Sequence, residues 1–513
     1  MHAKIFSATT VGVSSHSIEV EVDLSFGLVN FCIVGLPDKA IKESKDRIRA
    51  ALKNSGLRIP ERLITVNLAP AHLKKQDTLF DVPIAIAILQ AAKLLRMTKQ
   101  FIDETIFLGE LSLDGSIRKV CGVLAIVHGA LDAGKKRVIV PVENCLEASL
   151  IDGVEIIGVK SLVDLVGYLR GEIEIKPSPP TFVAAQKTHK STLDFSDVKG
   201  HFLQKKMLQI AAAGGHNILL IGAPGCGKTM LAKRLPTIMP SMSFNEVIET
   251  TKVYSVAGML QSEKLIFDRP FRSPHHIISQ AGLVGGGSFP RPGEISLAHN
   301  GVLFLDEMTE FQRGTLEVLR QPLEDNSVLI SRANCSVEFP SSFLMVGALN
   351  PCPCGYMAVK KKNCRCSQQA VEKYFGKLSG PLIDRLDIHI HVPSINYDEL
   401  KVPPQQGKTS AQMRVEVDRT IQFQRDRQGD TLNASLSPTQ VEKYCVLTSA
   451  AEELVQKVFE RIGLSMRAYH KVLKLARTLA DFDGSQKIDY AHIRDGVMNR
   501  CLDRKDDNPR KTA

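Results

Sequence analysis

The sequence has no apolar run long enough to span a membrane. Its longest apolar stretch, near Val82 to Leu95, is interrupted by Gln90 and Lys93, whereas a transmembrane helix needs about 20 consecutive, mainly apolar residues. The chain also lacks, after Met1, the basic segment and short apolar segment that form a secretory signal. We therefore expect a cytoplasmic protein without a membrane partner.

Cysteine is present without the pattern of a disulfide scaffold. The eleven cysteines are scattered along 513 residues, and without a secretory signal they indicate reduced thiols or a metal site. Hydrophobic residues make up 44% and charged residues 23% of the chain, values typical of a globular protein and not of a disordered one. The formal net charge of +10 favours a polyanionic partner but does not identify one.

The length predicts about three or four folded units of roughly 100 to 200 residues each. Residues 1–175 alternate strand-like and helix-like runs and are expected to form one α/β unit. Residues 176–200 include Lys176-Pro177-Ser178-Pro179-Pro180 and are predicted to be a linker. The strand-like runs are Ile18–Val22, Leu28–Val34, Ile64–Leu68 and Arg137–Val140, and the helical runs are Ala40–Asn54, Val82–Leu94 and Gly122–Ala133.

A second α/β unit is predicted over residues 201–395. A helical stretch, Leu203–Ala213, precedes the apolar strand Ile218–Ile221 and a glycine-rich turn. Two further apolar strands, Gly301–Leu305 and Phe343–Leu349, end in polar residues, as expected where ligands bind at the carboxyl ends of parallel strands. Residues 408–505 have helical periodicity and are predicted to form a helical lid, followed by a tail at 506–513. The predicted fold class is thus α/β multidomain.

The turn after the first strand of this unit fits a phosphate-binding loop without deviation. The pattern G-x-x-x-x-G-K-T is met by Gly222, Ala223, Pro224, Gly225, Cys226, Gly227, Lys228 and Thr229. Glycines let backbone N–H groups converge on phosphate oxygens, the lysine reaches the β and γ phosphates, and the threonine hydroxyl binds Mg²⁺. We therefore predict ATP and Mg²⁺ as ligands.

Acidic and amide residues follow the next strands. Asp306 and Glu307 end the apolar run from Val302, and we predict that Asp306 helps to hold Mg²⁺ while Glu307 polarises the attacking water. Asn350 ends the following strand, where its amide is expected to align the same water. Arg385 and Arg467 are candidates for contact with a γ-phosphate, although an isolated arginine is more often a surface residue.

These motifs resemble the YifB/ComM family of magnesium chelatase-like AAA+ proteins along essentially the whole chain. The most specific blocks are Arg272–His276, Gly285–Ser288, Arg291–Gly301, Asn350–Gly355 and Ser379–Asp387. The resemblance implies an AAA+ P-loop core in a ring-forming, hexameric ATPase related to magnesium chelatase and the MCM helicases. It implies that Arg385 is an arginine finger and Arg467 the sensor 2 residue of the lid.

The same resemblance implies a function. It points to an ATP-driven DNA motor for branch migration, with helicase activity, in the homologous recombination of natural transformation. Its partners would be single-stranded or branched DNA and recombination proteins such as a recombinase. The alternative is a magnesium chelatase-like ATPase subunit that remodels a protein or a metal-insertion complex.

The N-terminal unit is similar to the Lon protease domain, which has a ribosomal S5 domain 2-like fold. The matching segments are Gly109–Gly115 and Val138–Asn144. A Lon-type protease needs a nucleophilic serine and an activating lysine, and the corresponding stretches Phe80–Ala85 and Gly122–Ile126 contain neither. We therefore expect a non-proteolytic module for assembly or DNA contact.

Two loops of the ATPase unit are candidates for gripping DNA. The glycine-rich run Ile277–Pro292 ends near Arg291, and Val328–Val337 is predicted to be a hairpin with Arg332 at its tip. The resemblance identifies them as the helix-2 insert and the pre-sensor 1 hairpin of a translocating ring. Ordinary surface loops are the alternative. His275 and His276 are expected to lie on a loop surface and not to bind metal.

Four cysteines occur as two C-x-C pairs, Cys352 with Cys354 and Cys364 with Cys366. Four thiolates suffice for a tetrahedral structural zinc site, so residues 351–367 are predicted to form a zinc loop. Free thiols and a redox switch are the alternatives. Lys360, Lys361 and Lys362 lie between the pairs, where a metal-stapled loop could present them to phosphates.

Overall fold

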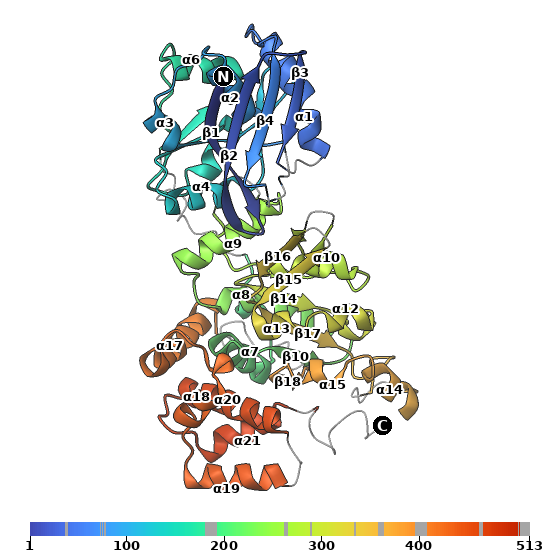
Figure 1. Cartoon of the computed structure of the whole chain (residues 1–513). Coiled ribbons are helices and arrows are strands. Elements are labelled where there is room, and N and C mark those ends of the chain that lie inside the picture. The colour runs from blue at the N-terminus through green and yellow to red at the C-terminus, as the bar shows by residue number, and fades with distance from the viewer. Residues whose placement is uncertain are drawn as a thin grey trace. The chain divides into compact units, whose positions relative to one another are not determined.

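The computed structural model of the chain describes residues 1–35, 39–71, 73, 75, 78–179, 192–260, 265–287, 290–332, 335–357, 364–394, 408–460, 465–500 and 502. The chain divides into two compact units (Figure 1). The first comprises Met1–Thr188 and Phe244–Phe267, and the second comprises His189–Ser243 and Asp268–Ala513. The predicted α/β multidomain class is confirmed, and the two compact units are fewer than the three or four that the length predicts.

The first unit contains a seven-stranded mixed sheet of order β3-β4-β2-β1-β5-β8-β9. Its long hairpin pairs residues from His2 with Asp23 to Val11 with Ser14, and alternate residues of β2 are buried, as expected for a sheet with one covered face. The sequence patterns did not reveal β1, β5 or β9. The strands are β1 (His2–Val11), β2 (Ser14–Ser25), β3 (Asn30–Val34), β4 (Leu63–Ala69), β5 (Thr105–Phe107), β8 (Arg137–Pro141) and β9 (Glu155–Val159).

The longest apolar stretch of the sequence is a core helix of this unit. All but one residue of α2 (Asp81–Ala91) are buried, because the helix packs on β1 and β2. None of the helices in the described part of the chain is long and apolar enough to cross a membrane. The other elements are α1 (Lys39–Asn54), α3 (Lys99–Asp103), β6 (Glu110–Leu111), β7 (Ile117–Arg118), α4 (Val123–Asp132), α5 (Cys145–Ala148) and α6 (Leu162–Arg170).

The helix α9 (Phe244–Val256) belongs to the first unit although it lies within the sequence of the second. It packs against α4. The hydroxyl of Ser255 donates a 2.5 Å hydrogen bond to Glu147 Oε1, and the same carboxylate oxygen accepts the N–H of Leu124. Because Glu147 is buried, these bonds satisfy a carboxyl oxygen that would be costly to bury without hydrogen-bond partners. No pattern in the sequence indicates that α9 belongs to the first unit.

The second unit is built on a five-stranded sheet of order β11-β14-β17-β10-β18. All of its strand pairs are parallel, so the carboxyl ends of the strands share one edge. The apolar strands predicted at 218–221, 301–305 and 343–349 are the three central ones. The strands are β11 (Phe271–Arg272), β14 (Val302–Leu305), β17 (Leu344–Leu349), β10 (Ile218–Ile221) and β18 (Ile388–His391).

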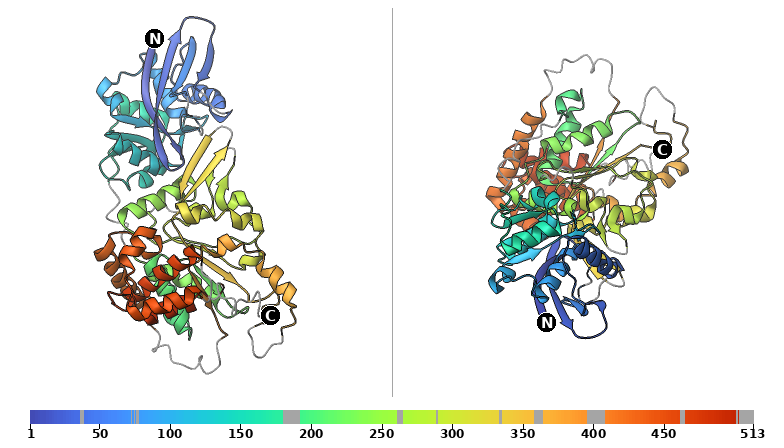
Figure 2. Two further views of the ribbon diagram at one scale, coloured as in Figure 1. Left: turned by 60° about the horizontal axis from the view of Figure 1, so that its bottom comes forward. Right: turned by 90° about the horizontal axis from the view of Figure 1, so that it is seen from above.

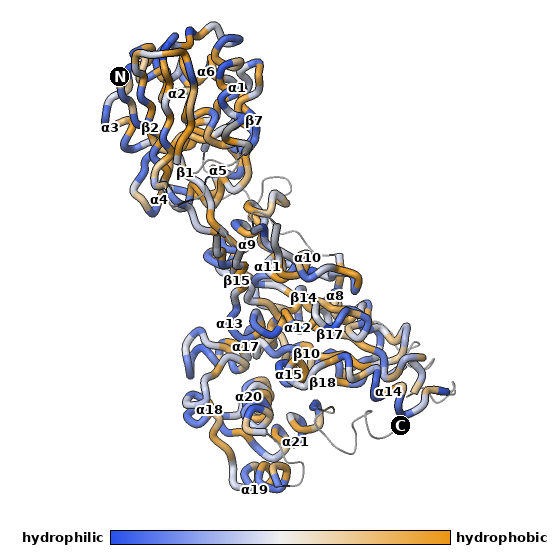
Figure 3. Tube along the Cα trace, turned by 45° about the vertical axis from the view of Figure 1, so that its right-hand side comes forward, coloured by the Kyte–Doolittle hydropathy of each residue, from blue (hydrophilic) through white to orange (hydrophobic). Residues whose placement is uncertain are grey.

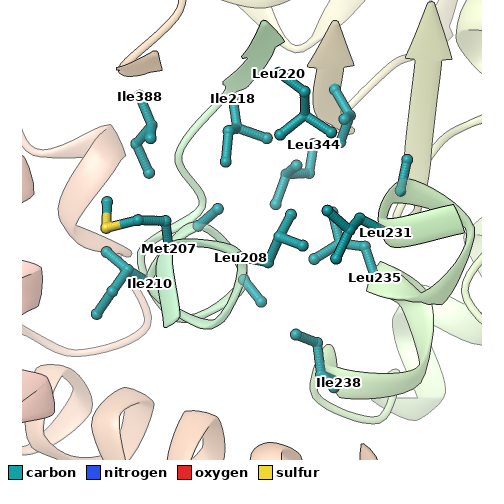
Figure 4. Close-up of a cluster of buried hydrophobic side chains, with 14 of the residues drawn as sticks. Met207, Leu208, Ile210, Ile218, Leu220, Leu231, Leu235, Ile238, Leu344 and Ile388 are labelled. Atoms are coloured by element: carbon teal, nitrogen blue, oxygen red, sulfur yellow. The ribbon is translucent and has the colours of Figure 1, made fainter. Parts of the chain in front are cut away.

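Two helices beside the phosphate-binding loop pack on this sheet (Figure 4). Met207, Leu208 and Ile210 come from α7 (Phe202–Gly214), and Leu231, Leu235 and Ile238 come from α8 (Lys228–Ile238). They enclose side chains of the strands, Ile218, Leu220, Leu344 and Ile388. Phe195 is fully buried in the same core. The end of the segment predicted as a 176–200 linker is therefore part of this unit, because Phe195 contributes apolar area to its core.

The C-terminal part of the second unit is helical, as the periodicity predicts. Its helices surround a small core that includes Val441, Leu473 and Ile493, and they carry both hydrophilic and hydrophobic residues (Figure 3). Met413 of α17 and Leu475 of α20 also enter the sheet core. The helices are α17 (Ser410–Gln428), α18 (Pro438–Tyr444), α19 (Ser449–Val458), α20 (Met466–Phe482) and α21 (Tyr490–Met498).

Candidate nucleotide-binding site

The loop Gly222–Thr229 connects β10 to the first turn of α8, the context that a phosphate-binding loop requires. Gly225 and Gly227 have φ angles of +77° and +95°, which side chains other than glycine rarely adopt. A Cβ atom on Gly222 would lie 2.4 Å from the carbonyl oxygen of Val392. Two of these glycines are therefore required by the backbone conformation and the third by close packing.

The ammonium of Lys228 links the loop to the neighbouring strand. Its Nζ lies 2.6 Å from the carbonyl oxygen of Gly222 and 3.0 Å from Asn350 Oδ1. Burial lowers the pKa of Lys228, while Asp306 and Glu307 are among the groups that act in the opposite direction. The structure thus brings Asn350, at the end of β17, beside the loop lysine.

The two predicted Mg²⁺ ligands are in direct contact. The hydroxyl of Thr229 donates a 2.7 Å hydrogen bond to Asp306 Oδ2, and Asp306 Oδ1 accepts the N–H of Glu307 at 3.0 Å. A hydroxyl and a carboxylate are the oxygen ligands that Mg²⁺ prefers, together with phosphate oxygens and water. The residues present therefore fit the ion.

Glu307 lies in the left-handed backbone region, with φ +50°, and its side chain is 56% exposed. Its Oε2 lies 3.9 Å from Nδ1 of His276, and the His276 ring packs edge-on against Phe311. His275 is exposed, as expected, but His276 is only partly exposed. Its position beside the carboxylate was not predicted from the sequence.

Sheet topology explains why His276 reaches Glu307. β11 pairs in parallel with β14, so the residues that follow Arg272 emerge at the same sheet edge as those that follow Leu305. Arg272 also forms two 2.6 Å hydrogen bonds with Glu294, which join β11 to α11 (Glu294–Leu297). If Phe271–Arg272 had been recognised as a strand in the sequence, the position of His276 beside Glu307 could have been predicted.

The two predicted γ-phosphate arginines are brought together in the structure. Arg385 Nη2 lies 2.6 Å from Glu324 Oε1, and Arg467 Nη2 bonds the same oxygen. The side chain of Arg385 is only 8% exposed, and its other bonds go to the carbonyl oxygens of Arg320 and Pro381. Nothing in the sequence indicated a shared carboxylate.

The four cysteines converge as the zinc prediction requires. Their sulfur atoms all lie within 4.8 Å of one another. The N–H of Tyr356 is the main cause that lowers the pKa of Cys354 to about 6, whereas burial is the main cause that raises the pKa of Cys352 to about 12. Gly355 lies against the phosphate-binding loop, since a Cβ there would be 2.6 Å from Cδ of Pro224. Lys360, Lys361 and Lys362 lie outside the described residues.

The two candidate DNA loops pack against each other. The predicted hairpin forms from β15 (Ser327–Arg332) and β16 (Cys335–Pro340), and it extends from the second unit (Figure 2). Ile330 on its buried face lies so close to Gly285 of β12 (Gly285–Gly286) that a Cβ there would be 2.8 Å away. Arg291 of β13 (Arg291–Pro292) is exposed. The backbone of Arg332 ends β15, whereas its side chain lies outside the described residues.

The outward face of the hairpin carries little positive charge among its described side chains. Leu329 is 51% exposed, and Ser331 and Ser336 share a 2.9 Å hydrogen bond. Glu338 is also exposed. Contact with a phosphate backbone would therefore depend on the tip, where Arg332 lies.

The first unit carries a buried ion pair in the segment compared above with Lon proteases. Asp81 Oδ2 lies 2.9 Å from Nε of Arg47 and accepts the N–H of Leu111. Burial is the main cause of a raised pKa of Asp81, and the bonds from Arg47 and Ser44 oppose it. An ion pair with these bonds fixes α1 against α2.

A parallel sheet with a phosphate-binding sequence between β10 and α8 is the architecture of P-loop proteins. Residues 194–400 match the family described as magnesium chelatase, subunit ChlI. Residues 20–144 match subunit ChlI of Mg-chelatase, and residues 407–500 match the C-terminal region of that subunit.

Similar proteins cover nearly the whole chain. Competence protein ComM of Haemophilus influenzae is 42% identical over 508 residues, which are 98% of this chain and 97% of that protein. YifB of Escherichia coli is 39% identical over 98% of this chain and 97% of its own length. Lon protease 2 of Bacillus subtilis is 32% identical over 31% of this chain and 33% of its own. The chain belongs to the YifB/ComM family of magnesium chelatase-like AAA+ ATPases.

Proposed function

We propose that the chain hydrolyses Mg·ATP at the loop Gly222–Thr229 and uses the energy to move DNA as a subunit of a hexameric ring. The observation that carries the ATPase proposal is the convergence of Lys228, Thr229, Asp306 and Asn350 at one sheet edge. These side chains come from the carboxyl ends of three adjacent parallel strands, the usual place of a ligand site in such a sheet.

Each residue has a role in the proposed reaction. The backbone N–H groups of residues 222–229 bind the phosphates, and Lys228 exchanges its carbonyl and amide acceptors for β- and γ-phosphate oxygens. Thr229 and Asp306 would hold Mg²⁺, which neutralises charge that develops on the phosphate oxygens. Glu307 polarises the attacking water, and Asn350 orients it.

Arg385 is the proposed arginine finger for the γ-phosphate of a neighbouring subunit, and Arg467 is the proposed sensor 2 residue of the lid. Arginine fingers contribute about 10³ to 10⁵ in rate in other nucleoside triphosphatases. Because Arg385 is nearly buried in its own chain, its delivery to a neighbouring nucleotide requires a change of hydrogen-bond partners.

DNA as the substrate of the motor is proposed from the family relationship. The similar protein of Haemophilus influenzae is named a competence protein, and we extend this role to branch migration in the recombination of natural transformation. The net charge of +10 agrees with a polyanionic partner, and Arg291 and Arg332 are the proposed contacts. Recombination proteins are the proposed partners, in the cytoplasm.

A chelatase-like subunit is the second candidate function, because all three family matches carry that description. Such a subunit would remodel a protein or a metal-insertion complex and would not respond to DNA. ATP turnover of the purified chain, with and without branched DNA, separates the two functions. The motor predicts stimulation by DNA that falls steeply with salt, since bound counterions are released from the phosphate backbone. ATP turnover that does not change when DNA is added would favour the chelatase-like function.

We further propose that Cys352, Cys354, Cys364 and Cys366 hold a structural zinc ion. The donor set of four sulfur atoms within 4.8 Å of one another fits tetrahedral zinc. The loop that carries them touches Pro224 and begins directly after Asn350. In this proposal the metal fixes the loop beside the nucleotide and takes no part in the reaction.

A further inference from the structure

A single carboxylate joins the two proposed γ-phosphate arginines. Glu324 Oε1 accepts from Arg385 Nη2 at 2.6 Å and from Arg467 Nη2. Arg385 follows α15 (Gly380–Ile383), and Arg467 lies in the first turn of α20. Glu324 lies on a third element, α13 (Pro322–Asp325). One acidic side chain therefore connects the sheet region to the helical region through the residues proposed to act on ATP.

The bonds around Arg385 oppose its use in catalysis. Its Nη1 donates to the carbonyl oxygen of Pro381 at 2.7 Å and its Nε to that of Arg320 at 3.1 Å. With the Glu324 bond, three of the five N–H directions of the guanidinium are engaged within the chain. To reach a phosphate, Arg385 must break at least its bond to Glu324. The side chain of Glu324 is 44% exposed.

The carboxylate also compensates the repulsion between two cations. Guanidinium groups that share one oxygen lie within a few ångströms of each other, where like charges repel. The hydrogen bonds from Arg385 and then Arg467 are the main causes that lower the pKa of Glu324, so it is ionised at neutral pH. Loss of this charge would remove the attraction that holds the two arginines at one place.

The element that carries Glu324 leads directly into the candidate DNA hairpin. Asn326, with φ +53°, closes α13 through a bond from its N–H to the carbonyl oxygen of Pro322. Its own carbonyl oxygen accepts the N–H of Ser341 at 2.8 Å, just after β16 ends. Both strands of the hairpin are thus tied to the end of α13, and a force on the hairpin acts on the element that carries Glu324.

We propose that Glu324 is a positioning residue that holds Arg385 and Arg467 in an inactive arrangement, and that nucleic acid on the β15–β16 hairpin displaces it and releases both arginines. This inference rests on the proposed ATPase function. It explains how a signal at a hairpin can reach residues that act on nucleotide without any contact between the two ligands. The group with two arrangements is Glu324 with its two arginines. In one arrangement both arginines bind the Glu324 carboxylate, and in the other each arginine binds phosphate.

The test compares Glu324→Gln with Asp325→Asn in the full chain. Both variants remove one negative charge from α13, but Asp325 is exposed and has no role in the proposed arrangement. We expect Glu324→Gln to raise ATP turnover without DNA by about fivefold or more, the lower end of typical coupling between sites, and to reduce the ratio of DNA-stimulated to basal turnover. Asp325→Asn should match the unchanged protein. Basal turnover that is unchanged or lower in Glu324→Gln overturns the proposal.

A second measurement does not depend on hydrolysis. Hydrogen exchange of the nucleotide-free chain should be faster in Glu324→Gln than in the unchanged protein over α13 and the first turn of α20, because the bonds between them are weakened. Equal hydrogen exchange in the two proteins overturns the proposal that Glu324 holds Arg385 and Arg467. If the unchanged protein hydrolyses no ATP, the proposed function fails, and the exchange comparison still decides whether Glu324 holds the two segments.

Discussion

Lys471 of α20 lies 2.6 Å from Asp387, a residue that directly precedes β18, and the two side chains are only 15% and 10% exposed. Asp387 also faces His216 at 3.4 Å. Burial alone would raise the pKa of Asp387, but the charge of Lys471 and the bond to His216 hold it well below its usual range. A nearly buried ion pair therefore anchors the helical region to the sheet.

Lys471→Met should destabilise the second unit by about 3 to 5 kcal/mol, because it leaves a nearly buried carboxylate without its partner. Since the pKa of Asp387 is lowered in the folded chain, the stability it contributes is present above about pH 4 and is lost as the pH falls below that value. Thermal unfolding at pH 7 and at about pH 3.5 should show a difference between the two proteins that shrinks in acid.

A matched control for this prediction is Lys457→Met on α19, where the lysine forms an exposed pair with Glu453. Exposed pairs contribute about 0 to 1 kcal/mol, so this variant should unfold close to the unchanged protein at both pH values. Equal losses in the two variants would show that Lys471 contributes no more than a surface lysine.

Glu307→Gln should retain ATP binding and lose turnover. The amide keeps the size of the side chain but cannot act as a base, and general base catalysis contributes about 10² to 10⁴ in rate. Binding of a fluorescent ATP analogue and release of phosphate measure the two properties separately. Glu310→Gln, which changes a neighbouring carboxylate paired with Lys377, should retain both. Near-normal turnover in Glu307→Gln would remove Glu307 from the mechanism.

Arg332→Ala should lower DNA-stimulated turnover more than basal turnover, because the hairpin tip is proposed to contact phosphates and not the nucleotide. The slope of the logarithm of DNA affinity against the logarithm of salt concentration should become smaller in magnitude by about one. Arg494→Ala removes an exposed cation on α21 and should leave both properties unchanged. A parallel fall in basal and stimulated turnover would argue against a DNA contact at the tip.

Cys364→Ser should reduce the zinc content of the purified chain, because three sulfur ligands and a hydroxyl hold zinc less well than four thiolates. Metal analysis should give about one zinc per chain for the unchanged protein and clearly less for the variant. Cys32→Ser, a change at an exposed cysteine of the first unit, should not alter the metal content. A chain without zinc in its unchanged form would favour the free-thiol alternative.

Local sequence was sufficient for the features that depend on neighbouring residues. The strand Ile218–Ile221, the loop after it and α8 follow from an apolar run, glycine spacing and helical periodicity, all of which act over a few residues. Family resemblance added roles for Arg385 and Arg467 that spacing alone does not support. The short strands β5 and β11 were missed, because two or three residues carry no measurable alternation.

By itself, the sequence determined that this chain has a phosphate-binding loop, acidic and amide residues at strand ends, and four cysteines in two pairs, because each is a pattern of nearby residues. Tertiary structure alone decided which distant residues meet. It places His276 beside Glu307, joins Arg385 to Arg467 through Glu324, and assigns α9 to the first unit. These relationships depend on strand order and helix packing, which arise from burial of apolar area across the whole chain and leave no local pattern.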